Sequence, residues 1–429
     1  MSGTRPFDAR AAGTGRAGDR LRPGGAAVDG GPPPRRSAGK PAPPRTGQDG
    51  GTHIPRRALI VSANIGEGHN ATGRALQETI ERIWPDCEVR WHDVLHAMGP
   101  GIGPMTRAFY VMQVERTPWI YEFFFDAIWR YRWFLNWSKR LIGSWCGRTM
   151  ARMIRRYDPD LIISTYPLGS AALAWLRDHR RLDAPIGAWV SDYCPHPFWV
   201  YGKLDVTYVM HSSAVPVALE AEPDARVRVG ALPVTGDFHP ADRAEARSRL
   251  GVAEDSFVVL LTTGSLGFGR SGQAVPALLA AGPRIEVVAV CGRNERRRQR
   301  LEQAGFPDGR VRVLGWTDDM PGWLTAADVV VTNGGGVTAL EAMACGRPVI
   351  MFNPIPGHGK TNASLMAASG AALLCESPAD LTAGVRRLST DTAAHARLEE
   401  TEVEAAKSRD REDDLRELAA SGRRAPVRR

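Results

Sequence analysis

The sequence is poor in cysteine, lacks a secretory leader and carries little net charge in its body. Its six cysteines among 429 residues are scattered without a CxxC pair, so neither a disulfide framework nor a cysteine metal site is indicated. The N-terminal segment has no apolar core of the kind that a secretory signal needs. The composition, 43% hydrophobic and 24% charged, is typical of a globular protein and excludes collagen-like repeats and wholesale disorder.

The net charge of +8 belongs almost entirely to the N-terminal segment. Residues 1–57 contain 11 Lys or Arg and 4 Asp or Glu, together with 12 Gly and 9 Pro. Residues 58–400 are close to neutral, so the folded part does not indicate nucleic acid as a partner. We expect residues 1–56 to be disordered, because they cannot bury enough apolar surface to offset the ordering entropy. This tail is either a solvated segment or a weak anchor to anionic lipid.

Two series of short apolar strands, each alternating with helical patterns, predict the fold class. The first series is Ala58–Ser62, Leu161–Ser164, Ile186–Val190, Val206–Met210 and Val227–Val229. The second is Phe257–Thr262, Ile285–Val290, Val311–Leu314, Val329–Val331 and Pro348–Phe352. We therefore expect an α/β protein with two Rossmann-like domains, 57–238 and 254–390, that face each other across a cleft. A polar, solvated C-terminal helix and tail are expected over 391–429.

The strongest candidate for ligand binding is a glycine loop in the second series. Gly334–Gly336 follow a strand and begin a helix, so their backbone N–H groups and the helix N-terminus can hold a pyrophosphate. Glu341 lies near the start of that helix, where its carboxylate can accept hydrogen bonds from ribose hydroxyls. The alternative is a tight turn without a ligand.

Two further loops of the second series also follow strands. Gly264, Ser265 and Gly267 lie in a glycine loop that can shield phosphates. Lys360 and Asn362 follow the last strand, and the carboxyl ends of strands are where ligands of α/β proteins bind. A solvated loop is the alternative for this second segment.

In the first series, two loops carry residues capable of acid–base chemistry. Gly66–His69 follow the opening strand and begin a helix, and a histidine there can deprotonate a hydroxyl near neutral pH. A capping or packing role for His69 is the alternative. Asp192 and His196 share the loop after Ile186–Val190, without the spacing of a metal site.

Residues 107–150 form an aromatic segment, with 13 of the 32 aromatic residues of the chain. In a helix over 119–137, one stripe of aromatic rings would consist of Phe125, Trp129, Trp133 and Trp137. A second apolar stripe would lie on nearly the opposite face. Tryptophan among basic residues predicts a membrane interface for the face that does not pack on the domain. Burial of both faces within the protein is the alternative, and the charges in the segment exclude a membrane-spanning helix.

Together these motifs resemble the monogalactosyldiacylglycerol synthase and processive diacylglycerol glucosyltransferase family, from about Arg57 to Leu388. The markers stand in the family's order: Gly66-Glu67-Gly68-His69, Asp192…His196-Pro197-Phe198-Trp199, Gly230-Ala231-Leu232-Pro233-Val234, Cys291-Gly292-Arg293-Asn294, Gly334-Gly335-Gly336…Thr338…Glu341-Ala342 and Ile355-Pro356-Gly357…Asn362. The resemblance implies the two-domain GT-B fold of sugar transferases.

The resemblance also implies a function: inverting transfer of a hexose from a UDP-sugar to a lipid hydroxyl, that of diacylglycerol, without a catalytic metal ion or other cofactor. His69, Asp192 and His196 would be catalytic. The donor site would comprise Gly264, Ser265, Gly267, Arg293, Gly334, Gly335, Gly336, Thr338, Glu341, Lys360 and Asn362. Contacts to the acceptor or the membrane would come from Gly66, Gly68, Trp199 and the aromatic stripe.

Two departures from the family leave the donor sugar open. His358-Gly359 stand where the galactolipid synthases carry Gln-Glu, and Glu67 stands where they carry Gly. We expect a peripheral enzyme on the cytoplasmic face of a membrane with anionic lipid. The alternatives are a soluble UDP-sugar-dependent transferase or epimerase with a non-lipid substrate, and a non-catalytic nucleotide-sugar-binding protein.

Overall fold

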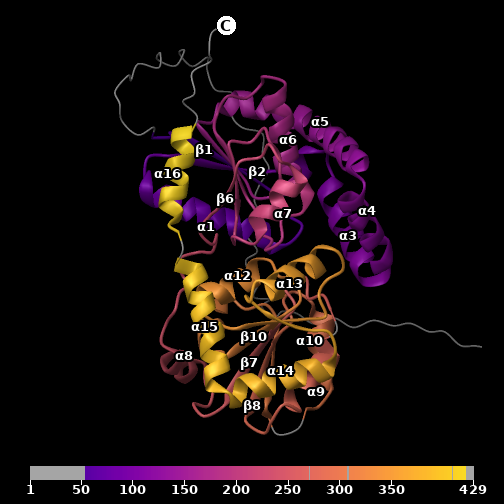
Figure 1. The fold of residues 1–429 in the computed structure, drawn as a ribbon, viewed down its shortest axis with the longest axis vertical. Helices are drawn as coiled ribbons and strands as arrows, with labels where there is room; N and C mark the ends of the chain where they lie inside the picture. Colours follow the sequence, from indigo (N-terminus) through magenta and orange to yellow (C-terminus); the bar gives the residue numbers. More distant parts are fainter. Residues whose placement is uncertain (1–53, 270, 307–308, 408, 422–429) are drawn as a thin grey trace, which may run out of the picture. The chain divides into compact units, whose positions relative to one another are not determined.

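Two parallel six-stranded sheets, each flanked by helices, confirm the predicted α/β fold class (Figure 1). The structure is a computed structural model that describes residues 54–269, 271–306, 309–407 and 409–421. The predicted disorder of residues 1–56 therefore falls almost entirely outside the described residues. We call the part that contains the first sheet the N-lobe and the part that contains the second sheet the C-lobe.

The N-lobe sheet has the strand order β2-β1-β3-β4-β5-β6, and all its neighbours pair in parallel. Its strands are β1 (Arg57–Ser62), β2 (Glu88–Asp93), β3 (Leu161–Ser164), β4 (Ile186–Trp189), β5 (Val206–Val209) and β6 (Val227–Val229). Its helices are α1 (Glu67–Ile83), α2 (Val94–Ala97), α3 (Ile102–Arg116), α4 (Pro118–Arg130), α5 (Arg132–Tyr157), α6 (Pro167–Asp178) and α7 (Ala214–Ala221), with a 3₁₀ turn at Pro197–Trp199.

The C-lobe sheet has the strand order β12-β11-β10-β7-β8-β9, again with parallel pairing throughout. Its strands are β7 (Phe257–Thr262), β8 (Ile285–Val290), β9 (Val311–Leu314), β10 (Val329–Thr332), β11 (Val349–Phe352) and β12 (Leu373–Cys375). The helices after β6 are α8 (Arg243–Leu250), α9 (Ser271–Leu279), α10 (Glu295–Gln303), α11 (Met320–Ala326), α12 (Val337–Ala344), α13 (His358–Ala368), α14 (Pro378–Thr390), α15 (Thr392–Lys407) and α16 (Arg411–Ser421).

All ten predicted strands are present, and the two that were missed lie at sheet edges. The interior strands are continuous apolar runs because helices cover both faces of a parallel sheet. β2 has an exposed or half-buried side chain at every position, and β12 has only three residues. β2 therefore carries no continuous apolar run, and β12, although apolar, is too short to stand out in the sequence.

The aromatic segment is not the single helix over 119–137 that the sequence predicted. It forms α3, α4 and α5, and the backbone leaves the helical conformation at Tyr131 (φ −113°, ψ 93°). This break rotates the two halves of the predicted stripe apart. Phe125 is buried against the protein, whereas Trp133 and Trp137 are 70% and 56% exposed. The stripe is therefore divided between an inward and an outward position.

The C-terminal segment is not the solvated helix that its polar composition suggested. It forms α15 and α16, drawn in yellow in Figure 1. Leu415 and Leu418 of α16 are fully buried in a cluster that includes residues of the N-lobe sheet. The Tyr208 hydroxyl donates to the carbonyl of Asp414 (2.8 Å), and the Ala231 N–H donates to its carboxylate (2.9 Å). Few apolar residues suffice here, because α16 buries one narrow face.

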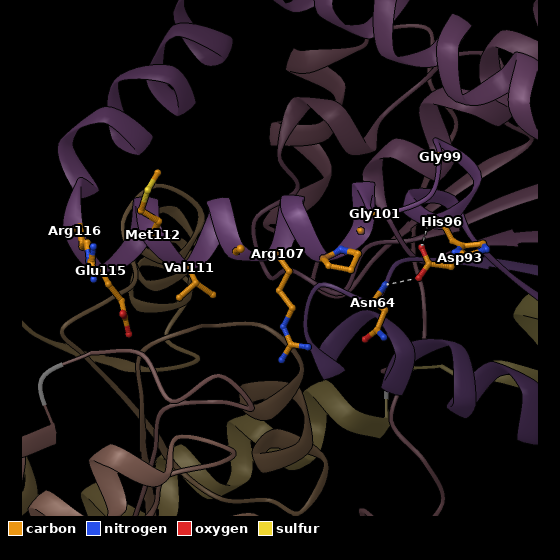
Figure 2. A pocket seen from close by; sticks show the side chains of 13 residues that line it. Asn64, Asp93, His96, Gly99, Gly101, Arg107, Val111, Met112, Glu115 and Arg116 are labelled. Carbon is orange, nitrogen blue, oxygen red and sulfur yellow. Dashed lines mark hydrogen bonds between the residues drawn. The ribbon is translucent and has the colours of Figure 1, made fainter. Parts of the chain in front are cut away.

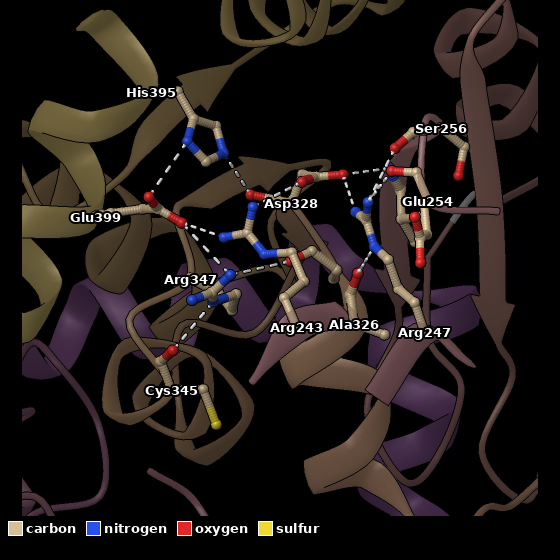
Figure 3. A network of polar contacts seen from close by, with 12 residues as sticks. Arg243, Arg247, Glu254, Ser256, Ala326, Asp328, Cys345, Arg347, His395 and Glu399 are labelled. Carbon is tan, nitrogen blue, oxygen red and sulfur yellow. Dashed lines mark hydrogen bonds and ion pairs between the residues drawn. The ribbon is translucent and has the colours of Figure 1, made fainter. Parts of the chain in front are cut away.

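A network of charged side chains attaches α15 to the C-lobe (Figure 3). Asp328, just before β10, accepts from Arg243 (2.9 Å) and Arg247 (2.5 Å). Glu399 on α15 pairs with Arg243, with Arg347 (3.4 Å) and with His395. Burial acts to raise the pKa of Glu399, but these three partners lower it to about 2. These ion pairs tether α15 to the C-lobe without a large apolar face.

Candidate active site

A cleft of about 580 Å³ is lined by loops from both lobes. The N-lobe contributes the loop between β1 and α1 and the residues after β4, and the C-lobe contributes the loops after β7, β10 and β11. Each of these loops follows the carboxyl end of a parallel strand, where ligands of α/β folds bind. The Gly68 backbone comes close to the Val337 side chain, so the two lobes approach each other at the cleft.

The loop Gly334–Gly336 joins β10 to α12 and lines the cleft. Gly335 has φ +63°, and a Cβ there would stand 2.5 Å from Cβ of Asn362, so the loop requires glycine for both its conformation and its space. Thr338 and Glu341 also line the cleft from α12. The structure therefore brings together the predicted pyrophosphate loop and the predicted ribose carboxylate.

The Glu341 carboxyl is held in its neutral form at neutral pH. Burial raises its pKa to about 8, an effect that the charge of Arg74 partly opposes. A carboxylate that is costly to ionise in the empty cleft gains from any ligand that donates hydrogen bonds to it. A vicinal diol such as that of ribose is such a ligand.

In the loop after β7, some residues line the cleft and another packs against the loop after β8. Gly264 (φ +70°) and Ser265 line the cleft, as predicted. Gly267 is not among the lining residues; it packs against Asn294 and the Cys291 carbonyl, where a Cβ would stand 2.6 Å from each. Its role is to let this loop lie close to the neighbouring loop after β8.

A bridge of charged groups crosses the cleft between the two lobes. The Glu67 carboxylate pairs with Arg293 of the C-lobe (2.7 Å) and with Arg74 of its own helix (3.4 Å). The Glu67 N–H donates to the Ser265 hydroxyl (3.3 Å), and Arg293 stacks over the Trp316 ring at 4.0 Å. Although burial acts to raise the pKa of Glu67, the two arginines lower it.

His69 stands on the N-lobe side of the cleft in the first turn of α1. Its Nδ1 lies 3.2 Å from the Ser191 hydroxyl, and its ring contacts Tyr166 edge-on at 4.9 Å. Burial lowers the pKa of His69, while the Asp192 carboxylate acts in the opposite direction. The imidazole is therefore neutral at neutral pH and able to accept a proton.

Asp192 and Asn362 hold one another across the cleft. The Asn362 amide donates to the Asp192 carboxylate (3.3 Å) and to the Gly334 carbonyl (3.2 Å), and it accepts from the Cys194 N–H (2.7 Å). Asn362 is fully buried, so it supports the loops and does not line the cleft. Asp192 does line it.

Several predicted site residues lie outside the cleft lining. His196 is buried beside Phe125, with ring centroids 4.5 Å apart, and burial lowers its pKa to about 3. Trp199 is fully buried and donates to Asp192 (3.1 Å), so it is not a membrane contact. Lys360 forms an ion pair with Glu122 of α4. Trp129 also packs on His196, so the rings of Phe125 and Trp129 face inward.

The structure adds lining residues that the sequence reasoning did not single out. These are chiefly Arg74, Tyr110 and Trp316, and His358, which the sequence marked as a departure from the galactolipid synthases, lines the cleft with them. Trp316 follows the strand β9, so a systematic search of strand ends would have found it. Arg74 and Tyr110 lie within helices, and only the tertiary contacts bring them to the cleft.

A second cavity of about 670 Å³ lies beside α3 (Figure 2). It is lined by Asn64, Asp93 and His96 at one end and by Glu115 and Arg116 at the other, with Arg107 and apolar side chains between them. Asn64 lies in the loop between β1 and α1, and the next residue, Ile65, lines the cleft, so the cavity borders the N-lobe side of the cleft.

Within the described residues, no group of acidic, histidine or cysteine side chains is arranged to hold a metal ion. Among the helices of that same part of the chain, none combines the length and hydropathy needed to cross a membrane.

Comparisons with known proteins agree on a sugar transferase. Residues 69–234 match the family model of monogalactosyldiacylglycerol synthase, and residues 259–391 match that of glycosyl transferases group 1. A relative from Bacillus licheniformis named processive diacylglycerol beta-glucosyltransferase is 26% identical over 345 residues, which cover 78% of this chain and 87% of the relative. A relative of the same name from Bacillus subtilis is 25% identical over 342 residues, covering 78% and 87%.

Solved structures share the fold. MurG of Acinetobacter baumannii is 16% identical with a TM-score of 0.52, covering 85% of this chain and 99% of that one. HepE of Anabaena, solved with UDP-glucose, is 15% identical with a TM-score of 0.51, covering 85% and 98%. The calicheamicin glycosyltransferase CalG4 is 15% identical with a TM-score of 0.55, covering 86% and 99%.

The two Rossmann-like lobes and the cleft that both line have the GT-B fold. The family models and the relatives, which are named as sugar transferases, support the family that the order of motifs predicted, that of the monogalactosyldiacylglycerol synthases and processive diacylglycerol glucosyltransferases. The prediction that the chain is an enzyme is confirmed with it.

Proposed function

We propose that this protein transfers a hexose from a UDP-sugar to the hydroxyl of a diacylglycerol-like lipid at a membrane surface, with inversion at the anomeric carbon. The observation that carries the proposal is that one cleft holds a neutral histidine on one lobe and a glycine loop with a carboxyl group on the other. The names of the relatives, diacylglycerol glucosyltransferase and galactolipid synthase, support the lipid acceptor.

On the donor side, the diphosphate would lie against the backbone N–H groups of Gly334–Gly336 and of the Gly264 loop. The N-terminus of α12 and the charges of Arg74 and Arg293 stabilise the negative charge that develops on the leaving UDP. Glu341, one turn into α12, would accept hydrogen bonds from the ribose. In this proposal positive charge comes from the protein, so the step uses no catalytic metal ion.

On the acceptor side, His69 would take the proton of the lipid hydroxyl as its oxygen attacks the anomeric carbon. The bond from that carbon to the UDP oxygen breaks on the opposite face, so the configuration inverts. Asp192, whose charge favours the protonated form of His69, stabilises the imidazolium that results. His196, which is buried outside the cleft, supports Phe125 and takes no proton.

The acceptor would reach the cleft from a membrane surface that contacts α3–α5. This segment exposes Trp119, Phe123, Trp133, Trp137 and Trp145, which are 46–70% exposed. Residues 102–157 carry ten Lys or Arg and three Asp or Glu. Aromatic rings among basic residues suit the interface of a membrane that contains anionic lipid. We propose that the protein acts as a peripheral enzyme on the cytoplasmic face.

A panel of UDP-sugars tests this proposal. The purified protein is incubated with each donor and with vesicles that contain diacylglycerol, and the lipids are analysed by mass spectrometry. We expect a lipid product heavier by one hexose unit for at least one donor. Hydrolysis or epimerisation of the donor without a lipid product would contradict the proposal, as would UDP binding without any turnover.

Two substitutions separate the donor and acceptor roles. His69→Ala should leave UDP affinity within about twofold and lower turnover by about 10²–10⁴-fold, the usual contribution of a general base. Glu341→Ala should weaken UDP binding instead. Full turnover of His69→Ala would exclude the histidine as the base.

A further inference from the structure

Helix α4 has two faces of different character. Its outward face exposes large rings: Trp119 is 68%, Phe123 66% and Phe124 50% exposed. Its inward face carries Tyr121 and Phe125, which pack against the protein. An isolated helix with aromatic rings on both faces needs two partners. The inward partner is visible in the structure, and it is the donor side of the cleft.

Three contacts connect α4 to the first turn of α13 and to the C-lobe loop before it. The Tyr121 hydroxyl lies 3.2 Å from Nδ1 of His358. Glu122 forms an ion pair with Lys360. Gly357 (φ +67°) has no room for a side chain, because a Cβ would stand 2.7 Å from the Tyr121 ring. This loop is thus shaped to receive α4.

Helix α3 makes the corresponding contact with the other donor loop. Tyr110 meets the Phe268 ring edge-on at 5.7 Å, and Phe268 belongs to the loop after β7. Tyr110 also packs edge-on against Tyr121, with ring centroids 5.9 Å apart. Tyr110, Phe268 and His358 all line the cleft. The aromatic segment therefore touches both C-lobe loops that are predicted to hold the UDP-sugar.

His358 is set by this contact to face a ligand. The ring is partly exposed within the cleft, and Nδ1 is engaged by Tyr121. Burial lowers the pKa of His358, although the charge of Asp192 opposes this, so the ring is neutral and carries one N–H. In the tautomer in which the Tyr121 hydroxyl donates to Nδ1, that N–H is at Nε2 and can donate to an oxygen of the nucleotide-sugar.

We propose that α4 couples the seating of the protein on a bilayer to the binding of the nucleotide-sugar, with Tyr121 as the positioning residue that transmits the effect through His358. The occupant of the outward face is a lipid bilayer with anionic lipid, because exposed Arg116, Arg130 and Arg132 border the exposed rings. This coupling rests on the proposed function for its biological meaning, but it is measurable without turnover.

Coupling of this kind is reciprocal. If a bilayer holds α4 in the position that orders both donor loops, it increases the affinity for UDP, and bound UDP increases the affinity for the bilayer by the same factor. Coupling free energies between sites commonly correspond to about 5–150-fold. We expect a factor of about fivefold or more.

The experiment measures UDP binding by titration calorimetry with and without vesicles of phosphatidylglycerol and phosphatidylcholine that contain no diacylglycerol. Vesicle binding is measured separately by co-sedimentation with and without saturating UDP. Wild-type protein should show about fivefold tighter binding of each partner in the presence of the other. Equal UDP affinity with and without vesicles would overturn the proposal.

Tyr121→Phe removes only the hydroxyl that contacts His358. The variant should still bind UDP and vesicles, but its UDP affinity with vesicles should be about equal to its UDP affinity without them, a coupling factor of about one. Tyr131→Phe is the matched control, because Tyr131 ends α4 on an exposed surface, 45% exposed, and should keep the full factor. Unchanged coupling in Tyr121→Phe would overturn the role of Tyr121.

The outcomes also separate this proposal from the proposed function. Glycolipid synthesis and vesicle binding without any change in UDP affinity would leave the function standing and reject the coupling. Absence of vesicle binding would reject both the membrane surface and the coupling. A concentration-dependent dimer that is lost in Phe123→Ser would identify a second copy as the occupant and also reject the proposal.

Discussion

Two glutamates in the same cleft have opposite pKa shifts, and the difference follows from their neighbours. Glu67 has two arginines within ion-pair distance and remains ionised. Glu341 is half-buried at the cleft wall, and the charge of Arg74 compensates the desolvation of its carboxyl only partly, so its pKa rises to about 8. Each carboxyl group leads to a measurable prediction about donor binding.

Binding of the UDP-sugar should depend on pH through Glu341. A ribose diol donates hydrogen bonds to the ionised carboxylate, so a pKa of about 8 in the empty cleft means that binding below pH 8 first requires loss of a proton. Affinity should therefore fall as pH decreases from 8 to 6, by up to about tenfold per pH unit. Titration calorimetry over pH 6–9 measures this slope.

Glu341→Gln provides the control, because the amide does not titrate. Its affinity for the UDP-sugar should be lower than that of the wild type at pH 9 and should not change across the range. A wild-type affinity that is flat with pH would show that ionisation of Glu341 is not linked to donor binding.

Glu67→Gln should strengthen the binding of UDP. In the empty cleft the Glu67 carboxylate pairs with Arg293 and Arg74, and an incoming diphosphate must compete for them. Because partly exposed ion pairs contribute about 0.2–1 kcal/mol, we expect affinity to rise about 1.4- to 5-fold at low ionic strength. Calorimetry at 20 and 300 mM salt would measure it, and the gain should shrink at the higher concentration.

Glu81→Gln is the matched control for that prediction, since Glu81 also lies on α1 and its carboxylate accepts a hydrogen bond from the Gln77 amide (2.6 Å). Its UDP affinity should equal that of the wild type. Weaker binding in Glu67→Gln would show that the bridge assembles the donor site and does not compete with the diphosphate.

At the scale of elements, the break at Tyr131 decides which rings meet solvent. A continuous helix would place Phe125, Trp129, Trp133 and Trp137 on one side. The break leaves Phe125 and Trp129 against His196 and turns Trp133 and Trp137 outward. The predicted stripe is thus divided, and only its outward half, Trp133 and Trp137 on α5, remains available to contact a membrane.

Replacing Trp133 and Trp137 together by serine should release the protein from vesicles. Transfer of two large rings from the interface to water costs at least about 1.4 kcal/mol, or about tenfold in affinity. Both side chains are largely exposed, so the melting temperature should stay unchanged. Co-sedimentation with vesicles that contain anionic lipid measures the loss.

Leu219→Ser is the control for this loss, because Leu219 is exposed on α7, outside the aromatic segment. It should retain full vesicle binding. Equal binding by the folded double variant and the wild type would exclude this face of α5 as a membrane contact.

At the scale of the whole chain, α16 completes the N-lobe although it follows the C-lobe in sequence. Leu415 and Leu418 enter the same cluster as Trp189 and Tyr208 of the N-lobe sheet. Gly187 of β4 leaves the space for Leu418, since a Cβ there would stand 2.6 Å from that side chain. The last helix therefore belongs structurally to the first lobe.

Leu418→Ala should lower the free energy of unfolding by about 2–5 kcal/mol, the usual cost of such a truncation in a packed core. Urea denaturation followed by tryptophan fluorescence measures it. Glu417→Ala, whose side chain is 45% exposed, is the control and should change stability by no more than about 0.5 kcal/mol. A Leu418→Ala midpoint equal to that of the wild type would show that α16 does not stabilise the N-lobe.

The predictability of each element depended on its surroundings. Buried parallel strands such as β7 and β8 appeared in the sequence with their observed bounds, because helices on both faces demand continuous apolar runs. The edge strand β2 did not appear, because every side chain in it is exposed or half-buried, and β12 did not appear, because it has only three residues. The glycine loops could be recognised in the sequence because their backbone conformation excludes other residues. The contacts of Arg74, Tyr110 and His358 could not be predicted, because they join segments distant in sequence.

The sequence by itself determined the two α/β lobes, the glycine loops and the family, since apolar periodicity and backbone requirements depend on residues that are close together in the sequence. Only the tertiary structure decided which candidates share one cleft. It separated His69 and Asp192 from His196, gave Glu67 its arginine partners and placed α4 on the donor loops. The physical reason is that the pKa, burial and partners of a side chain depend on groups brought together by folding, and Glu67 and Arg293 are 226 positions apart along the chain.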